Sequence, residues 1–268
     1  MKKLNHLEEI FNSYSTFIID LWGVMHDGVK LNPKAIESVD HLMKNQKKVI
    51  FLSNAPRPSN EVRKFLRKLK MEERFMENVL TSGEAAMIAL QNHKYGKYFY
   101  HLGPARDEMV FDKIKENKSE LEKSNFILCT GLFDDQEDDL NYYKNLLEKH
   151  TSKILICTNP DLTVHRGNIE EFCAGKIAEI FENLGGKVVY FGKPHQEIYE
   201  MCFKKSEKVL AIGDNLNTDI RGANNMNIDS IFISNGVHRS EFKDEIELIN
   251  LQSKYKVKAN YYQTQLTW

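Results

Sequence analysis

Polar side chains follow apolar, strand-like stretches at four places along this chain: Asp20, Ser53, Lys193 and Asp214. An apolar run that ends in an acid is how a buried parallel strand brings a carboxylate to its carboxyl-terminal edge. If the strands before Asp20 and Asp214 share one sheet, their carboxylates form a site for a hard cation, because such cations prefer oxygen ligands. The same edge then also offers a hydroxyl and an ammonium group.

The stretches that carry these residues alternate with helical patterns. Strand-like runs occupy residues 17–19, 48–52, 209–212 and 231–234. Apolar residues recur at helical spacing in segments 35–43 and 62–69, with Ser59 or Asn60 as a candidate N-cap of the second, and 219–226 predicts a further helix. Alternating strands and helices are typical of a parallel sheet with helices on both faces.

The middle of the chain has strands and helices of its own. We expect strands at 98–102, 126–130 and 153–157, helical stretches at 112–123 and 138–149, and an amphipathic helix at 170–184. The four candidate site residues all lie outside this part, which is therefore interpreted as an insertion. The predicted fold is α/β: a Rossmann-like, doubly wound parallel sheet core of residues 1–80 plus 190–268, with an inserted α/β cap domain of residues 81–189.

The order of these residues resembles the haloacid dehalogenase (HAD) superfamily, whose members are mostly phosphatases with an aspartate nucleophile. The first motif of that family, Asp-x-Asp-Gly-Val/Thr, reads Asp20-Leu21-Trp22-Gly23-Val24 here. The later motifs are matched by Ser53, by Lys193, and by Asp214 with Asp219. The place of the insertion and the segments 158–161 and 185–194 resemble subfamily IIA, and the resemblance covers nearly the whole chain.

The resemblance implies a Mg²⁺-dependent phosphatase that acts on a small phosphorylated metabolite through an aspartyl-phosphate at Asp20. The metal would be held by the carboxylates of Asp20 and Asp214 and by the backbone carbonyl of Trp22. Asp219 would lie close by, holding a water of the metal or orienting Lys193. Ser53 and the amides near Asn54 would hold the phosphoryl oxygens. Lys193 would offset anionic charge and keep Asp20 ionised.

The one departure from the family pattern is Trp22, which stands where the family has its general acid/base. An indole cannot donate a carboxylic-acid proton, and such help is typically worth about 10²–10⁴-fold, or roughly 3–5 kcal/mol of barrier. We therefore expect slow turnover of alkyl and sugar phosphates, and faster turnover of p-nitrophenyl or acyl phosphates. His26 and Asp27 are candidates for a substitute acid, although Asp27-Gly28 is also a common tight-turn pair. The indole could instead stack on a planar ligand or plug the pocket.

The inserted segment offers candidates for binding the non-reacting end of a substrate. Asn159 and Asp161 follow an expected buried strand and so would face the core, and His165 and Arg166 come shortly after. Arg57, close to Ser53, could meet the phosphate or the cap. Polar residues of these kinds are more often ordinary surface residues than ligands of a substrate.

Composition and the lack of certain motifs argue against several other classes of protein. The 268 residues are 41% hydrophobic with a formal net charge of −1, and the interspersed charges form no basic face for a nucleic acid. No stretch approaches the roughly 20 apolar residues of a membrane span. The four cysteines form no C-x-x-C pair, and no G-x-G-x-x-G or P-loop is present. We expect a reduced, cytoplasmic protein without nucleic-acid or membrane partners, and we leave open a homodimer through the cap.

Three functions are consistent with these features of the sequence. The leading hypothesis is a HAD-type phosphatase with weakened acid/base catalysis. The second is a pseudophosphatase that binds metal and phosphate without turnover. The third is an acyl-phosphatase or phosphotransferase that has no use for the missing acid. The aromatic residues of segment 261–268 could pack on the core or on a partner.

Overall fold

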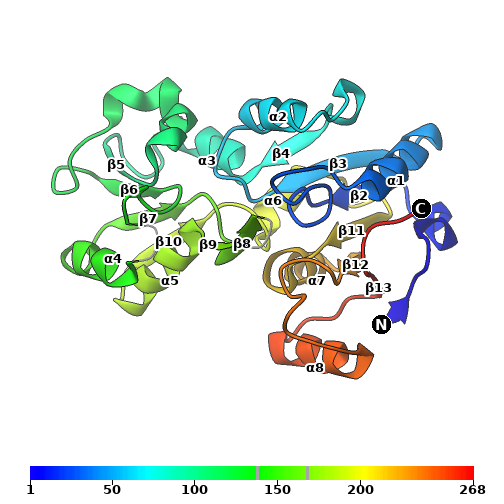
Figure 1. The fold of residues 1–268 in the computed structure, drawn as a ribbon. Coiled ribbons are helices and arrows are strands. Elements are labelled where there is room, and N and C mark those ends of the chain that lie inside the picture. The colour runs from blue at the N-terminus through cyan, green and yellow to red at the C-terminus, as the bar shows by residue number, and fades with distance from the viewer. Residues whose placement is uncertain (137–138, 167–168) are drawn as a thin grey trace.

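The computed structural model describes residues 1–136, 139–166 and 169–268, which form two parallel sheets and a separate hairpin (Figure 1). The larger sheet has seven strands, and every neighbouring pair in it is parallel. Their order is β1 (Lys2–Lys3), β13 (Tyr261–Gln263), β12 (Asp229–Ile233), β11 (Val209–Gly213), β2 (Thr16–Ile19), β3 (Lys48–Ser53) and β4 (Val79–Thr81). The strands that precede Asp20 and Asp214 are therefore direct neighbours, as the sequence predicts.

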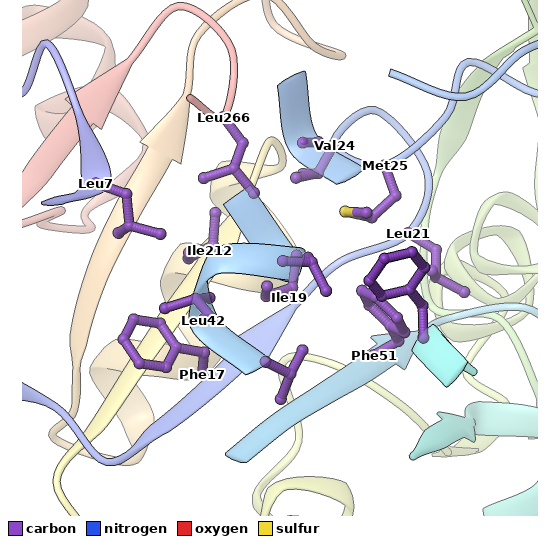
Figure 2. Close-up of a cluster of buried hydrophobic side chains, with 14 of the residues drawn as sticks. Leu7, Phe17, Ile19, Leu21, Val24, Met25, Leu42, Phe51, Ile212 and Leu266 are labelled. Atoms are coloured by element: carbon purple, nitrogen blue, oxygen red, sulfur yellow. The ribbon is translucent and has the colours of Figure 1, made fainter. Parts of the chain in front are cut away.

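Helices cover both faces of this sheet. Successive residues of β2 point to opposite faces and therefore pack against different helices. Phe17 and Ile19 pack in one apolar cluster with Leu42 of α1 (Pro33–Lys44) and Leu66 of α2 (Ser59–Lys68), and part of that cluster is drawn in Figure 2. Ile18 packs in another with side chains of α3 (Ser82–Leu90) and α6 (Gln196–Glu200). The doubly wound arrangement expected from the sequence is confirmed.

A second parallel sheet is formed by the middle of the chain. Its order is β10 (Lys187–Tyr190), β7 (Ile154–Cys157), β6 (Phe126–Cys129) and β5 (Phe99–Leu102). Around it lie the 3₁₀ segment Ala105–Asn117, α4 (Leu140–Leu147), the 3₁₀ turn Glu148–His150 and α5 (Ala174–Asn183). This unit is the inserted α/β domain. Residues 81–189 remain our prediction for its extent, and its sheet runs one residue further, to Tyr190.

The prediction of one helix over 170–184 is wrong at its start. Residues Ile169–Phe172 form β9, which pairs antiparallel with β8 (Thr163–Arg166), and α5 begins only at Ala174. The apolar residues that suggested helical spacing therefore belong to two different elements. The hairpin β8–β9 lies between the two sheets in Figure 1.

Other boundaries also differ from the sequence-based expectations. Helix α2 begins at Ser59 itself, with Pro58 before it, and the Ser59 backbone N–H donates to Glu84 Oε2 at 3.1 Å. The helical stretch predicted at 112–123 overlaps only the end of the 3₁₀ segment Ala105–Asn117, and residues 118–123 are not helical. Position 138 of the stretch predicted at 138–149 lies outside the described residues. The helix predicted at 219–226 begins with a π-turn, Leu216–Ile220, followed by α7 (Arg221–Asn225).

The carboxyl-terminal part was not assigned to elements from the sequence. It contains α8 (Glu245–Tyr255) and the strand β13, and the Trp268 ring stacks on His41 at a centroid distance of 4.7 Å. The aromatic tail thus packs on the larger sheet's core. Among the described residues, no helix combines the length and the apolar character that crossing a membrane requires.

Candidate active site

Three buried carboxylates meet at the carboxyl-terminal edge of the larger sheet. The Asp20 backbone N–H donates to the Ile212 carbonyl at 2.9 Å, so Asp20 leaves β2 beside the end of β11, from which Asp214 follows. One carboxylate oxygen each from Asp20, Asp214 and Asp219 lies within 4.8 Å of the others. The convergence predicted from the two acid-tipped strands is therefore present.

Close packing of backbone around these acids depends on glycine. Gly23 has φ +83°, and a Cβ there would lie 2.0 Å from Asp214 Oδ2. On the other side, the Val237 backbone N–H donates to the same oxygen at 2.8 Å. The loop after Asp20 can approach Asp214 this closely only because position 23 carries no side chain.

Lys193 bridges two of the three acids. Its Nζ lies 2.6 Å from Asp20 Oδ1 and 2.7 Å from Asp219 Oδ1, and the residue is only 3% exposed. Asn54 fixes the Lys193 backbone, because its Oδ1 accepts from the Lys193 N–H at 2.8 Å and its Nδ2 donates to the Lys193 carbonyl at 3.0 Å. The neighbouring Ser53 is buried, and its Oγ accepts from the Ala55 N–H at 3.2 Å.

The charges of this cluster do not balance without a cation. Burial raises the pKa of Asp20 well above its usual value and that of Asp214 to about 8. Burial alone would lower the pKa of Lys193, but the surrounding carboxylates, Asp20 and Asp219 first, outweigh it and raise that pKa. Three acids against one ammonium leave excess negative charge when ionised, and a divalent cation with oxygen ligands fits this donor set.

A cavity of about 880 Å³ joins this edge to the inserted domain. The site residues predicted from the sequence line it, apart from Arg166. From the larger sheet and its loops these are Asp20, Trp22, His26, Asp27, Ser53, Asn54, Arg57, Lys193, Asp214 and Asp219, and from the inserted domain Asn159, Asp161 and His165. The side chain of Arg166 lies outside the described part of the chain.

Asp161 is the inserted residue that contacts the motif residues most directly. Its Oδ1 accepts from Asn54 Nδ2 at 3.3 Å and from Asn215 Nδ2 at 3.4 Å. Burial raises the pKa of Asp161 to about 6. Asn215 was missed from the sequence, although its position directly after Asp214 was the available signal.

Trp22 turns its indole towards the inserted domain. Its Nε1–H donates to the His165 carbonyl of β8 at 2.6 Å. The indole also meets the His26 ring edge-on, with centroids 5.1 Å apart, and His26 in turn meets Phe65 at 5.4 Å. The residue at the family's acid position therefore forms a contact between the nucleophile loop and the hairpin.

Neither candidate substitute acid has the properties of a proton donor at neutral pH. Burial lowers the pKa of His26 to about 4, and its Nδ1 accepts from the Gly28 N–H at 3.1 Å. Burial would raise the pKa of Asp27, but the N–H groups of Lys30 and Val29 outweigh it and lower that pKa. Both residues are thus deprotonated at pH 7, and Asp27 has the hydrogen bonds of a turn.

Arg57 forms its ion pair with the inserted domain and not with the buried acids. Its Nε is 3.8 Å from Oδ1 of Asp107, which belongs to the 3₁₀ segment of that domain. Burial raises the pKa of Asp107. Of the two roles considered for Arg57, the structure shows the contact with the cap.

Two family models match the sequence around these residues. A haloacid dehalogenase-like hydrolase model matches residues 17–115, and a HAD-hydrolase-like model matches residues 190–257. The chain belongs to the haloacid dehalogenase superfamily. The two matches include Asp20 and Ser53 in the first segment, and Lys193, Asp214 and Asp219 in the second.

Known relatives of this HAD protein span nearly its whole length. A haloacid dehalogenase-like hydrolase from Brucella suis has a TM-score of 0.86 and 27% identity, covering 98% of this chain and 100% of that one. An acid sugar phosphatase of Staphylococcus haemolyticus is 25% identical over 236 residues, 84% of this chain and 87% of that protein. Phosphoglycolate phosphatase 2 of Arabidopsis thaliana is 21% identical over 265 residues, 87% of each. The capped fold of subfamily IIA, expected from the sequence, is confirmed.

Proposed function

We propose that this HAD protein is a Mg²⁺-dependent phosphatase that hydrolyses a small phosphorylated metabolite through an aspartyl-phosphate on Asp20. The observation that carries the proposal is the position of Lys193 Nζ, 2.6 Å from Asp20 and 2.7 Å from Asp219, inside a buried trio of acids. Phosphoryl transfer needs an in-line nucleophile and a positive environment for the phosphoryl oxygens. This edge of the sheet offers both at the floor of one cavity.

In the first half-reaction, an oxygen of Asp20 attacks phosphorus while the bond from phosphorus to the leaving oxygen breaks. The departing oxygen keeps the bonding electron pair. The Lys193 ammonium lowers the pKa of Asp20 against the larger effect of burial, and Lys193 and the Ser53 hydroxyl bind phosphoryl oxygens. Asp20, Asp214 and the Trp22 carbonyl would hold Mg²⁺, with Asp219 alongside, and the bound ion would neutralise phosphoryl charge.

In the second half-reaction, a water attacks phosphorus, the bond from phosphorus to the Asp20 oxygen breaks, and the proton of that water passes to the phosphate product or to bulk water. An enzyme with an acid/base at position 22 would take the proton of that water there. An indole cannot do so, and His26 and Asp27 do not replace it well, for the reasons given above. We therefore expect hydrolysis of the aspartyl-phosphate to be slow, so that it accumulates.

The choice of substrate follows from the same substitution. Leaving groups that are stable as anions, such as p-nitrophenolate or a carboxylate, need no proton and should be preferred. The cavity volume lies within the range of small-molecule sites, about 300–1,000 Å³. The curated relatives are phosphatases of phosphoglycolate and of sugar phosphates by name, which supports a phosphorylated metabolite. Asn159, Asp161 and His165 line the same cavity, which supports a role for the inserted domain in binding the substrate.

Hydrolysis of p-nitrophenyl phosphate tests this proposal, with turnover measured against Mg²⁺ concentration and after EDTA treatment. We expect turnover that requires Mg²⁺ and is lost on chelation. The main alternative, a pseudophosphatase, is favoured by the Trp22 indole at the acid position. Calorimetry that shows Mg²⁺ binding without any hydrolysis would support that alternative instead.

A further inference from the structure

The contact between Trp22 and His165 joins two parts of the chain that are far apart in sequence. Trp22 follows the nucleophile by two residues, whereas His165 lies in β8 of the hairpin formed by Thr163–Arg166 and Ile169–Phe172. The indole Nε1–H donates to the His165 carbonyl at 2.6 Å. A neutral N–H group bound to a carbonyl at this distance is a well-formed hydrogen bond.

The indole has little freedom to move away from this contact. On its other side lies the His26 ring, 4% exposed and edge-on at 5.1 Å. His26 is held by Phe65 at 5.4 Å and by the Gly28 N–H, which its Nδ1 accepts at 3.1 Å. The Trp22 ring therefore forms a strut between the nucleophile loop and the hairpin.

The residue that Trp22 contacts, His165, also lines the cavity, and one nitrogen of its side chain has no hydrogen-bond partner in the described part of the chain. His165 lines the same cavity as Asp20 and Lys193, and its Nδ1 is buried without a hydrogen-bond partner among the described residues. The cavity-lining Arg57 also has such an atom, but that Nε faces Asp107 at 3.8 Å. A buried polar atom without a partner lowers stability unless a ligand or water satisfies it.

We propose that Trp22 positions His165 so that its imidazole Nδ1–H donates a hydrogen bond to the departing oxygen of the substrate. The proposal rests on the proposed phosphatase function and adds a residue to it. As the bond from Asp20 to phosphorus forms and the bond to the leaving oxygen breaks, the electron pair stays on that oxygen. The hydrogen bond stabilises the charge that develops there, and the oxygen takes its proton from water after release.

This arrangement defines a class of substrate. A hydrogen-bond donor that keeps its proton stabilises a developing anion without protonating it, so the leaving group must be a moderately stable anion such as a phenolate or an enolate. Among aryl phosphates, the help from His165 grows as the leaving group becomes more basic, because more charge gathers on the departing oxygen. A p-nitrophenolate, which delocalises its charge, gains least.

A series of aryl phosphates of increasing leaving-group basicity, from p-nitrophenyl to phenyl phosphate, tests the proposal with full-length protein and Mg²⁺. We expect His165→Phe to lower kcat/KM for phenyl phosphate about tenfold or more beyond its effect on p-nitrophenyl phosphate, because kcat/KM reports the step in which the leaving group departs. His165→Gln keeps an N–H donor without an ionisable ring and should recover most of that loss. His150→Gln, in the turn Glu148–His150, changes a histidine that does not line the cavity and should leave the whole series unchanged.

The positioning role of Trp22 has a separate readout. Trp22→Phe keeps an aromatic ring and removes the N–H, so we expect faster amide hydrogen exchange in β8 and β9 together with the same change in leaving-group dependence. An unchanged dependence in both His165→Phe and Trp22→Phe, with p-nitrophenyl phosphate still hydrolysed, would overturn this inference and leave the phosphatase standing. No hydrolysis of any ester by the natural protein would overturn both.

Discussion

Lys193 and Asp20 form a buried ion pair in which Nζ and Oδ1 are 2.6 Å apart and the side chains are only 3% and 9% exposed. Asp219 shares the same ammonium group at 2.7 Å. A buried charge that loses its partner is expensive, because neither water nor another cation is available to solvate it. The pair is therefore a stability element as well as a part of the reaction site.

Replacing Lys193 by Met should lower the unfolding free energy of the Mg²⁺-free protein at pH 7 by about 3–5 kcal/mol. With Mg²⁺ present, the same variant should lose most of its turnover. Lys64→Met is the control: its Nζ lies 2.7 Å from Glu61, but the lysine side chain is 60% exposed. An exposed pair of this kind contributes about 0–1 kcal/mol. Urea unfolding of both variants measures the difference. Equal losses would contradict the role given to the buried pair.

The residues of this pair could be found from the sequence because the signals were local. An apolar run before Asp20 and another before Asp214 mark parallel strands, and the carboxyl ends of such strands meet at one edge. Lys193 came from the order of the motifs. None of these inferences needed knowledge of which side chains touch.

The hairpin β8–β9 and the Trp22 contact could not be found in this way. Both depend on pairing between segments that only the folded chain brings together, and the apolar Phe172 fits a helical spacing equally well. The prediction of the first residue of α2 was inexact for the same reason. The backbone N–H of Ser59 donates to Glu84, which lies 25 residues further along the chain. The residues next to Ser59 in the sequence cannot predict such a partner.

Gly23→Ala should weaken Mg²⁺ binding about tenfold or more, because a Cβ at this position would lie 2.0 Å from Asp214 Oδ2. Gly185→Ala is a matched control, since Gly185 has φ +87° against +83° for Gly23 but no atom within 4 Å of the added Cβ. Both variants should lose about 1–2 kcal/mol from left-handed backbone. Calorimetric Mg²⁺ titration separates them, and similar affinities in the two would argue against the close approach.

Acidification should destabilise the protein through His26. Its pKa is about 4 when folded and about 6.5 when unfolded, so between these values the unfolded chain binds a proton that the folded chain does not. His26 therefore contributes a fall in stability as pH drops from 6.5 to 4, by up to about 1.4 kcal/mol per unit, whereas the raised pKa values of Asp161 and Asp214 contribute in the opposite direction.

The variant His26→Asn tests this origin, because an amide oxygen can still accept from the Gly28 N–H. Urea unfolding between pH 7 and pH 5 should show a smaller slope for the variant than for the natural protein. Part of the slope should remain, since burial also lowers the pKa of His101 to about 4. Identical slopes would remove His26 as a cause.

Trp22→Asp should raise kcat/KM for alkyl phosphates relative to p-nitrophenyl phosphate by about tenfold or more, because it restores a general acid for the departure of the leaving group. The ratio is the proper measure, since the same change removes the hydrogen bond to the hairpin. Trp22→Asn loses that bond too but supplies no proton, so its ratio should stay low. A folded, Mg²⁺-binding Trp22→Asp protein without the gain would show that acid loss is not the limit.

The central claim is a covalent intermediate on Asp20, and it can be tested by mass spectrometry. The protein is mixed with p-nitrophenyl phosphate and Mg²⁺, quenched in acid, digested and searched for a phosphorylated Asp20 peptide. We expect a phosphoryl group on Asp20 within the first turnover, and neither phosphorylation nor hydrolysis with Asp20→Asn. Hydrolysis that continues in Asp20→Asn, or an unmodified Asp20 peptide during steady turnover, would contradict it.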